Sequence, residues 1–227
     1  WIQWLFDRLC KEDALGVGYA HVGQENNFLW ENIRPGYAPQ LDVVKKMQQQ
    51  GFLRVETMAQ TAKYFREKYT LTPPMTFQAS TDWSERNLSC QWYASAAYRV
   101  GFLGENGHLR IRDMFLYDQN YQSRYLYCPM KQTKSVFDAL PVLYPQLWKK
   151  NLGARPFIRF LDKEGNELSG EITYGSLDPL TAKAELNMDS GCLSCVMRPG
   201  CMEITGAEMM VFDALPVFEA ANDNVIS

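Results

Sequence analysis

The chain lacks an apolar run of the roughly 18 residues that a transmembrane helix needs, and its first residues lack the layout of a secretory signal peptide. It also has no excess of basic residues, because its 227 residues carry a formal net charge of -3 and its pI is about 5.5. Nucleic acids and anionic membranes are both bound through basic surfaces, so we expect neither as a partner. These absences predict a soluble, cytoplasmic protein.

The six cysteines form neither a recognisable disulfide framework nor a complete zinc-binding set. Cys192, Cys195 and Cys201 have the spacing Cys-x2-Cys-x5-Cys, but a structural zinc ion takes four ligands and the other candidates lie far away in the chain. Unpaired cysteines of cytosolic proteins are commonly buried as small apolar residues. We therefore predict no metal and no cofactor.

The first 72 residues have the pattern of alternating helices and strands. Apolar residues at helical spacing predict helices over residues 1–14, 39–50 and 57–69. Short apolar runs predict buried strands over residues 17–22 and 52–56. Strands that alternate with helices in this way indicate a parallel sheet covered by helices. Two strands cannot form such a sheet alone, so we expect further strands from upstream, or packing of this segment on the second half.

The consecutive prolines Pro73 and Pro74 end this pattern, because they stop a helix and stiffen the chain. They divide the chain into an α/β segment at residues 1–72 and a second domain at residues 73–227. Many short strands with turns between them are typical of an antiparallel β-sandwich, so the predicted fold class is α+β. The predicted strands are residues 92–102 and 108–117 around an Asn-Gly turn, 157–161 and 168–174, 196–197 and 202–205, and 209–212.

The heptapeptide Val-Phe-Asp-Ala-Leu-Pro-Val occurs twice, at residues 136–142 and 211–217. Average residue usage gives such a repeat a chance on the order of one in ten thousand. The copies either present Asp138 and Asp213 to a ligand, or each form a strand followed by a turn that ends at proline. We favour the second interpretation, because the flanking residues differ and a single Asp among apolar residues is typical of a buried turn.

Three side chains near the ends of the predicted parallel strands are candidates for acid–base catalysis. His21 and Glu25 follow the first strand and Glu56 ends the second, and ligands of parallel α/β sheets bind at the carboxyl ends of strands. Two carboxylates and an imidazole can cleave a glycosidic or ester bond. Trp30 lies in a nearby polar segment typical of a sugar-binding loop. The structural alternative places both carboxylates at helix N-termini and the imidazole on a loop carbonyl.

The second half contains another set of candidate ligand-binding residues, namely Asp82, Trp83 and Trp92. An exposed cluster of aromatic and charged side chains on one face or rim of the sandwich would bind glycan. The alternative is that the aromatic residues belong to the core, with Trp92, Ala94 and Ala96 facing inward at the period of a strand.

Residues 17–25, residues 53–57 and the helix after them resemble the closing βα units of a bacterial carbohydrate-active barrel, as in polysaccharide deacetylases and glycoside hydrolases. Such barrels can be followed by a β-sandwich. The early Asp-Asp and His-x3-His metal set of those deacetylases is not in this chain, so its roles cannot be transferred. The resemblance implies the end of a barrel, with His21 or Glu25 at a late position. The start at Trp1 rather than Met fits an excised piece of a longer protein.

We therefore predict the C-terminal portion of a bacterial carbohydrate-active protein, not catalytic alone, whose β-sandwich supports an upstream barrel or binds glycan. The expected partners are carbohydrate and the upstream domain of the same protein. One alternative is a complete glycoside hydrolase or esterase that uses Glu25 and Glu56 as its acid–base pair. Another is a protein-interaction module without sugar chemistry.

Overall fold

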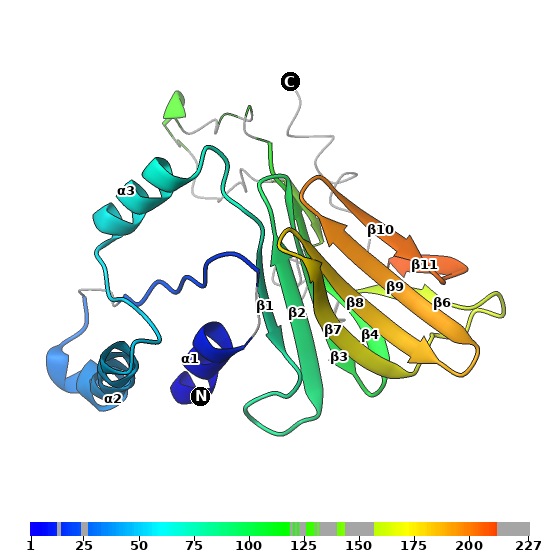
Figure 1. The fold of residues 1–227 in the computed structure, drawn as a ribbon, viewed down its shortest axis with the longest axis horizontal. Helices are drawn as coiled ribbons and strands as arrows, with labels where there is room; N and C mark the ends of the chain where they lie inside the picture. The colour runs from blue at the N-terminus through cyan, green and yellow to red at the C-terminus, as the bar shows by residue number, and fades with distance from the viewer. Residues whose placement is uncertain are drawn as a thin grey trace.

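A computed structural model describes residues 1–12, 15–23, 27–118, 120, 122, 126–129, 131, 140–143 and 157–212 of the chain. Helices occupy the N-terminal part and antiparallel sheets follow them (Figure 1). The α+β class is therefore confirmed. Among the described helices, none has both the length and the hydropathy that a membrane crossing requires.

Three helices form the N-terminal part: α1 (Ile2–Lys11), α2 (Trp30–Gln49) and α3 (Met58–Lys68). A capping box begins α3, in which the Thr57 amide donates to Gln60 Oε1 at 2.8 Å and the Gln60 amide donates to Thr57 Oγ1 at 3.3 Å. The three predicted helices are confirmed. However, α2 begins at Trp30, well before residue 39, so Pro35 and Pro39 lie inside the helix rather than at its start.

The two predicted parallel strands are wrong. Residues 17–22 and 52–56 are extended connections that pair with no described strand, and all described strand pairs are antiparallel. Val22 and Val55 are 39% and 56% exposed, so these segments are not buried as strands of a covered sheet would be. A short apolar run is compatible with an extended loop as well as with a strand, so the run alone does not determine a strand.

The strands form two antiparallel sheets. The larger sheet has the order β1-β2-β3-β4-β6-β11, with β5 paired to β4, and the smaller has the order β10-β9-β8-β7. The larger sheet contains β1 (Met75–Ala79), β2 (Leu88–Ala94), β3 (Tyr98–Glu105), β4 (His108–Leu116), β5 (Leu140–Leu143), β6 (Ile158–Leu161) and β11 (Met209–Phe212). The smaller sheet contains β7 (Glu171–Asp178), β8 (Thr181–Met188), β9 (Gly191–Arg198) and β10 (Cys201–Thr205).

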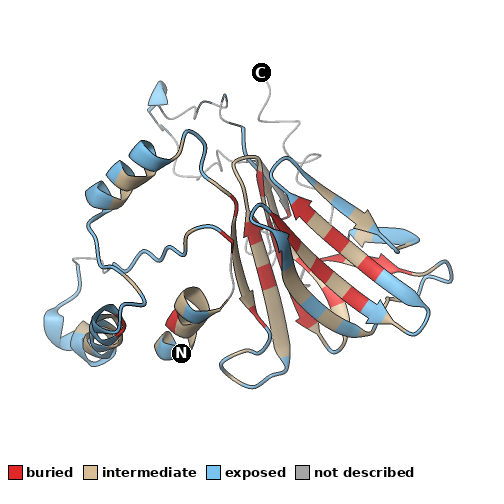
Figure 2. Cartoon of the chain, viewed as in Figure 1, coloured by how far each residue is buried: buried red, intermediate tan, exposed pale blue. Residues whose placement is uncertain are grey.

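Side chains of both sheets belong to one hydrophobic core (Figure 2). Val100 and Phe102 of β3 are fully buried, as are Leu186 of β8 and Leu193 of β9. Buried residues alternate with more exposed ones along β8 and β9, as expected where one face of a strand is covered. The hydroxyl groups of Tyr93 and Tyr98, both in the larger sheet, also donate hydrogen bonds to backbone carbonyls at turns of the smaller sheet.

The tight hairpins of the second half are largely confirmed. The Asn106-Gly107 turn joins β3 to β4, and the positive φ angles of these residues, 53° and 78°, are those that a two-residue hairpin turn favours. The hairpin of β9 and β10 also forms, and β11 has the predicted bounds. The predicted hairpin of residues 157–161 and 168–174 forms only next to its turn, where Leu161 pairs antiparallel with Glu167 and the Leu168 amide donates to the Phe160 carbonyl at 2.9 Å. Beyond these residues β6 belongs to the larger sheet and β7 to the smaller. Similarly, the segment 92–102 is divided between β2 and β3.

The two copies of the heptapeptide occupy different positions in their strands. Residues 140–142 of the first copy belong to β5, whereas residues 211–212 of the second copy end β11. A turn that ends at proline is therefore wrong for the first copy, because Pro141 lies within a strand and pairs with Phe115. Asp138 and Asp213 lie outside the described residues.

Candidate functional site

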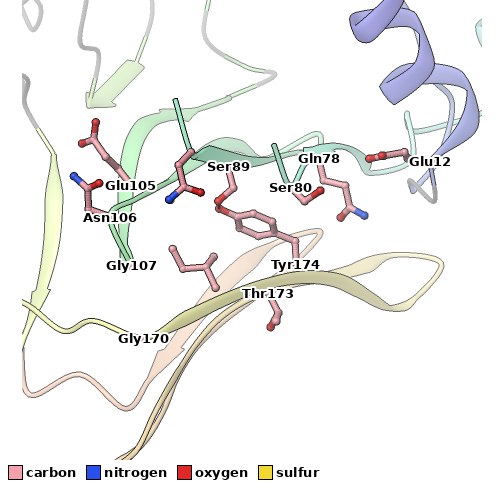
Figure 3. A pocket seen from close by; sticks show the side chains of 13 residues that line it. Glu12, Gln78, Ser80, Ser89, Glu105, Asn106, Gly107, Gly170, Thr173 and Tyr174 are labelled. Carbon is pink, nitrogen blue, oxygen red and sulfur yellow. Dashed lines mark hydrogen bonds between the residues drawn. The ribbon is translucent and has the colours of Figure 1, made fainter. Parts of the chain in front are cut away.

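A polar cleft of about 610 Å³ lies where one side of the two sheets meets solvent (Figure 3). There β1 is the outermost strand of the larger sheet and β7 the outermost strand of the smaller. The residue after α1 and the β3–β4 turn also contribute to the walls. The lining consists of Glu12, Gln78, Ser80, Asn87, Ser89, Gly104, Glu105, Asn106, Gly107, Gly170, Ile172, Thr173 and Tyr174.

A hydrogen bond between two hydroxyl groups joins the sheets within this lining. Ser89 Oγ of β2 lies 3.1 Å from the Tyr174 hydroxyl of β7. The absence of a side chain at Gly104 makes room for the pair, since a Cβ there would overlap Ser89 Oγ and lie 3.1 Å from the Tyr174 oxygen. Burial raises the pKa of Tyr174, so its hydroxyl stays protonated at neutral pH. Both groups are therefore neutral and can each donate and accept hydrogen bonds.

The backbone fixes the end of the cleft next to the β3–β4 turn. The Gly170 amide before β7 donates to the Gly107 carbonyl in the turn at 2.9 Å, which ties the smaller sheet to the larger. A Cβ at Gly170 would overlap the Asn187 carbonyl of β8, so only glycine lets the backbone lie this close to that carbonyl. The walls of the cleft are thus held by bonds between the sheets at two places.

A fully buried amide adjoins the cleft. Gln91 of β2 faces inward, and its Nε2 lies 3.4 Å from both Gln78 Oε1 and the Gly175 carbonyl. Its Oε1 has no hydrogen-bond partner among the described residues. Buried polar atoms are normally satisfied by protein or by ordered water. Gln91 thus places an amide group beside Gln78, which lines the cleft.

The charged groups of the lining are both carboxylates. Glu12 pairs with Arg8, and Glu105 Oε2 accepts a hydrogen bond from Arg110 Nη1 at 3.1 Å. Arg110 is shared, since its Nε also donates to Glu167 at 2.6 Å. Neither arginine lines the cleft, and no lysine, arginine or histidine is among the described residues that do.

Two of the three predicted catalytic residues share a second cleft. His21 and Glu56 both line a cleft of about 580 Å³ between the helices and the extended segments, with mainly apolar walls. Glu56 Oε2 accepts a hydrogen bond from Thr61 Oγ1 at 3.1 Å, and Glu56 Oε1 lies 3.3 Å from Arg54 Nη2. Glu56 does not cap α3, because Thr57 does. Glu25, the third candidate, lies outside the described residues.

Asp82 and Trp83 lie in the β1–β2 loop, which also supplies Ser80 and Asn87 to the polar cleft. The Asp82 carboxylate accepts hydrogen bonds from the Ser84 hydroxyl and from three backbone amides, those of residues 84, 86 and 88. The Ser84 hydroxyl and these amides lower the pKa of Asp82 to about 2. The Asp82 carboxylate thus holds the backbone of the loop through these hydrogen bonds, while the neighbouring Trp83 is 55% exposed.

Trp92 does not face the core, so the alternative that placed it inward is wrong. Gln91 and Tyr93 take the inward positions of β2 and are fully buried, so Trp92 lies on the outer face. There its ring covers Gly101 and lies 5.6 Å below the Arg99 guanidinium. Neither Trp92 nor Trp30, which begins α2 and is half exposed, lines either cleft described above.

The cysteine spacing does not build a metal site in the described part of the chain. Cys195 is buried in the core, while Cys192 and Cys201 are exposed. In the described part of the chain, no three His, Cys, Asp or Glu side chains are grouped closely enough to hold a metal ion.

The main residues of the polar cleft were not predicted as site residues. Gln78 and Ser80 occupy alternate positions along and just beyond β1, and Ser89 and Gln91 do the same in β2. Polar residues at successive inward positions of adjacent strands are the signal that marks this region. That signal can be recognised only when the inward face of β2 is known, and the sequence leaves open which face that is.

The fold and the cleft define an α+β chain with two antiparallel sheets and a polar cleft at one side of them. No family model, no curated protein and no solved structure shows a significant match to this chain.

Proposed function

We propose that the chain is the C-terminal portion of a bacterial carbohydrate-active protein, in which the two sheets pack as a β-sandwich and bind a glycan. The polar cleft is the observation that carries this proposal. Seven neutral side chains that donate or accept hydrogen bonds line it, and its volume of about 610 Å³ falls within the range usual for ligand sites. The seven are Gln78, Ser80, Asn87, Ser89, Asn106, Thr173 and Tyr174.

Sugars match such a lining because each hydroxyl both donates and accepts a hydrogen bond, as do the lining hydroxyl groups. The cleft is open along the sheet edge, which suits one or a few units of a longer glycan. Trp83 adds an exposed aromatic face on the loop that carries Ser80 and Asn87, and aromatic faces bind the apolar faces of sugar rings. Its contribution would be stacking rather than hydrogen bonding.

Binding of a panel of soluble oligosaccharides, measured by calorimetry, tests this proposal. We expect the double variant Gln78→Ala with Ser80→Ala to weaken binding about tenfold or more, because two hydrogen-bonding groups are lost. Ser194→Ala on β9 is the matched control, since Ser194 is outside the lining and the variant should bind normally. If no oligosaccharide binds, or if both variants bind like the unmodified chain, the proposed site is wrong.

The N-terminal part supports the proposed association with an upstream domain. Of the described residues in this part, the buried apolar ones are Phe6, Leu15 and Met47. The large apolar side chains that remain exposed are Trp1, Tyr19, Val22, Phe28, Leu29, Trp30, Leu41, Phe52, Val55, Met58 and Leu71. Large exposed apolar side chains in such number are typical of a surface that another domain covers, so we propose that a preceding barrel packs on this part of the chain. Adding the upstream sequence should reduce binding of a hydrophobic dye.

The shared cleft of His21 and Glu56 favours a second candidate function, that of a glycoside hydrolase or esterase. An imidazole and a carboxylate at one apolar cleft can act as acid and base on a bound ester or glycoside. Turnover of chromogenic sugars and esters would support this candidate, provided that Glu56→Gln or Glu25→Gln abolishes it. An inactive chain that still binds glycan would instead support the binding function.

A further inference from the structure

We propose that the second cleft, between the three helices and the extended segments, binds a single-chain organic acid whose hydrocarbon chain lies on the apolar walls and whose acid group meets Lys68. This apolar cleft of about 580 Å³ falls within the volume range usual for ligand sites. It shares no lining residue with the polar cleft, so the proposal does not depend on glycan binding.

The walls of the apolar cleft suit a hydrocarbon chain. Leu9 of α1, Leu41 and Val44 of α2, and Met58 and Phe65 of α3 all line it, so apolar side chains contribute from three helices. Leu41 and Met58 are 42% and 64% exposed, so part of this apolar surface is open to solvent. Each methylene group of a ligand that is fully buried there would strengthen binding by about fourfold.

Two cations contact one tyrosine at the edge of the apolar cleft. Tyr64 of α3 lines the cleft, and Lys68 Nζ donates a hydrogen bond to its hydroxyl group at 2.7 Å. The Arg54 guanidinium lies 5.5 Å from the centroid of the Tyr64 ring, and Arg54 Nη2 lies 3.3 Å from Glu56 Oε1. The hydrogen bond from Lys68 lowers the pKa of Tyr64, as expected for a hydroxyl group next to a cation.

Lys68 differs from Arg54 in that its contacts are with neutral groups. Its Nζ lies 5.1 Å and 5.2 Å from the ring centroids of Tyr64 and Tyr69. In the described part of the chain no carboxylate forms an ion pair with Lys68, and the adjacent Glu67 pairs with Lys63 instead. Lys68 ends α3, whose C-terminus carries about half a negative charge, so the helix does not cancel the full charge of the ammonium group.

An ammonium group at the edge of an apolar cleft favours an amphiphilic acid over other ligands. The acid group would accept hydrogen bonds from Lys68 and the chain would extend along the apolar walls. An amphiphilic amine would instead be repelled by Lys68 and Arg54. The buried centres of protein interfaces are depleted of lysine, so a covering domain would not explain a lysine at this position.

Calorimetry with four small amphiphiles tests the proposal: octanoate, 1-octanol, octylamine and hexanoate, each below the concentration at which it forms micelles. Near pH 8 the acids are ionised and the amine is protonated, because their ordinary pKa values are about 4 and about 10. We expect octanoate to bind about two- to fivefold more tightly than octanol, and octylamine to bind least. Hexanoate lacks two methylene groups and should bind about fivefold or more weakly than octanoate.

Three variants connect this preference to the apolar cleft. Lys68→Gln should remove the advantage of octanoate over octanol and leave the affinity for octanol within about twofold. Its matched control is Lys45→Gln, because Lys45 is an exposed lysine of α2 that does not line the cleft, and this variant should change neither affinity. Leu41→Asn should weaken all four amphiphiles alike, since it removes part of an apolar wall.

Equal affinities for octanoate and octylamine, or equal effects of Lys68→Gln and Lys45→Gln, would overturn the proposal. Failure of every amphiphile to bind would also overturn it and would leave the apolar cleft to the proposed upstream domain. None of these results affects the proposed glycan-binding function, which is tested separately with oligosaccharides at the polar cleft.

Discussion

Removal of the Tyr98 hydroxyl group should weaken the attachment of the smaller sheet to the larger one. Tyr98 lies in β3 and is 4% exposed, and its hydroxyl contacts two carbonyls of the β9–β10 hairpin. The oxygen–oxygen distances are 3.0 Å to Arg198 and 2.8 Å to Cys201. A single proton is shared between these acceptors, so the group acts as one bridge from the larger sheet to the end of the smaller.

The magnitude follows from what Tyr98→Phe removes and what it leaves. The ring remains, including its contact with the Tyr93 ring at a centroid distance of 5.6 Å, so no cavity forms. The loss is one hydrogen bond, worth about 0.5–1.5 kcal/mol, plus part of the cost of leaving a carbonyl unpaired. Because Cys201 is exposed, water can reach its carbonyl region and limit that cost. We expect the free energy of unfolding to fall by about 1–2 kcal/mol.

Urea unfolding, followed in parallel by tryptophan fluorescence and circular dichroism, measures this change. The midpoint should fall without a change in slope, because the same surface becomes exposed on unfolding. Tyr127→Phe is the control, since Tyr127 is 72% exposed and its variant should differ by less than about 0.5 kcal/mol. An unchanged midpoint for Tyr98→Phe would refute the bridge, and a shift seen by one probe alone would refute joint unfolding of the sheets.

Further predictions concern the core, the cleft and the turns. Leu186→Ala should destabilise the chain by about 2–5 kcal/mol in the same urea assay, because Leu186 is fully buried between the sheets. Burial raises the pKa of Tyr93 to about 12, whereas an unfolded tyrosine titrates near 10. The stability that depends on neutral Tyr93 is thus complete below pH 10 and should be lost as the pH rises toward 12, which melting temperatures at stepped pH would show. Gly104→Ala should abolish oligosaccharide binding in calorimetry by displacing Ser89, and a normal affinity would contradict the assigned role of that glycine. Asp82→Asn should loosen the β1–β2 loop and raise its rate of proteolysis, because a charged acceptor of several hydrogen bonds becomes neutral.

The second half of the fold was predictable where the chain carries local turn signals. The Asn106-Gly107 pair requires positive φ angles at both positions, so the hairpin of β3 and β4 is specified by two adjacent residues. The β9–β10 hairpin also forms at a local turn signal, the Pro199-Gly200 pair, although neither residue has a positive φ angle. The residues of a turn do not determine which sheet the next strand joins. The segments around residues 162–166 therefore pair only next to their turn, at Leu161 and Glu167, while β6 and β7 lie in different sheets.

The errors in the N-terminal part arise from burial, which a short apolar segment does not determine. Residues 52–56 have the composition of a strand, yet Phe52 and Val55 are about half exposed. An apolar segment becomes a covered strand only when neighbouring strands and helices bury it, and the described chain supplies none here. The same exposure is what the proposed upstream barrel would remove. The exposure of these residues therefore contradicts a parallel sheet within this chain and supports the proposed packing of an upstream domain on this segment.

The polar cleft could not have been predicted by the search for chemical motifs, because it is assembled from ordinary residues of distant segments. Ser89 and Tyr174 are 85 positions apart, and their hydroxyl groups meet only because Gly104, in a third strand, leaves space for them. Chemical motifs are carried by residues such as histidines and carboxylates, of which His21 and Glu56 are examples. A binding site for a hydroxyl-rich ligand requires instead that polar residues take inward positions where a core would place apolar ones. Gln78 and Gln91, paired across β1 and β2, are such residues. Gln91→Leu and Gln91→Met both remove the buried amide that contacts Gln78, so we expect each variant to weaken oligosaccharide binding to the same extent. An unchanged affinity in both variants would mean that the ligand does not enter the cleft.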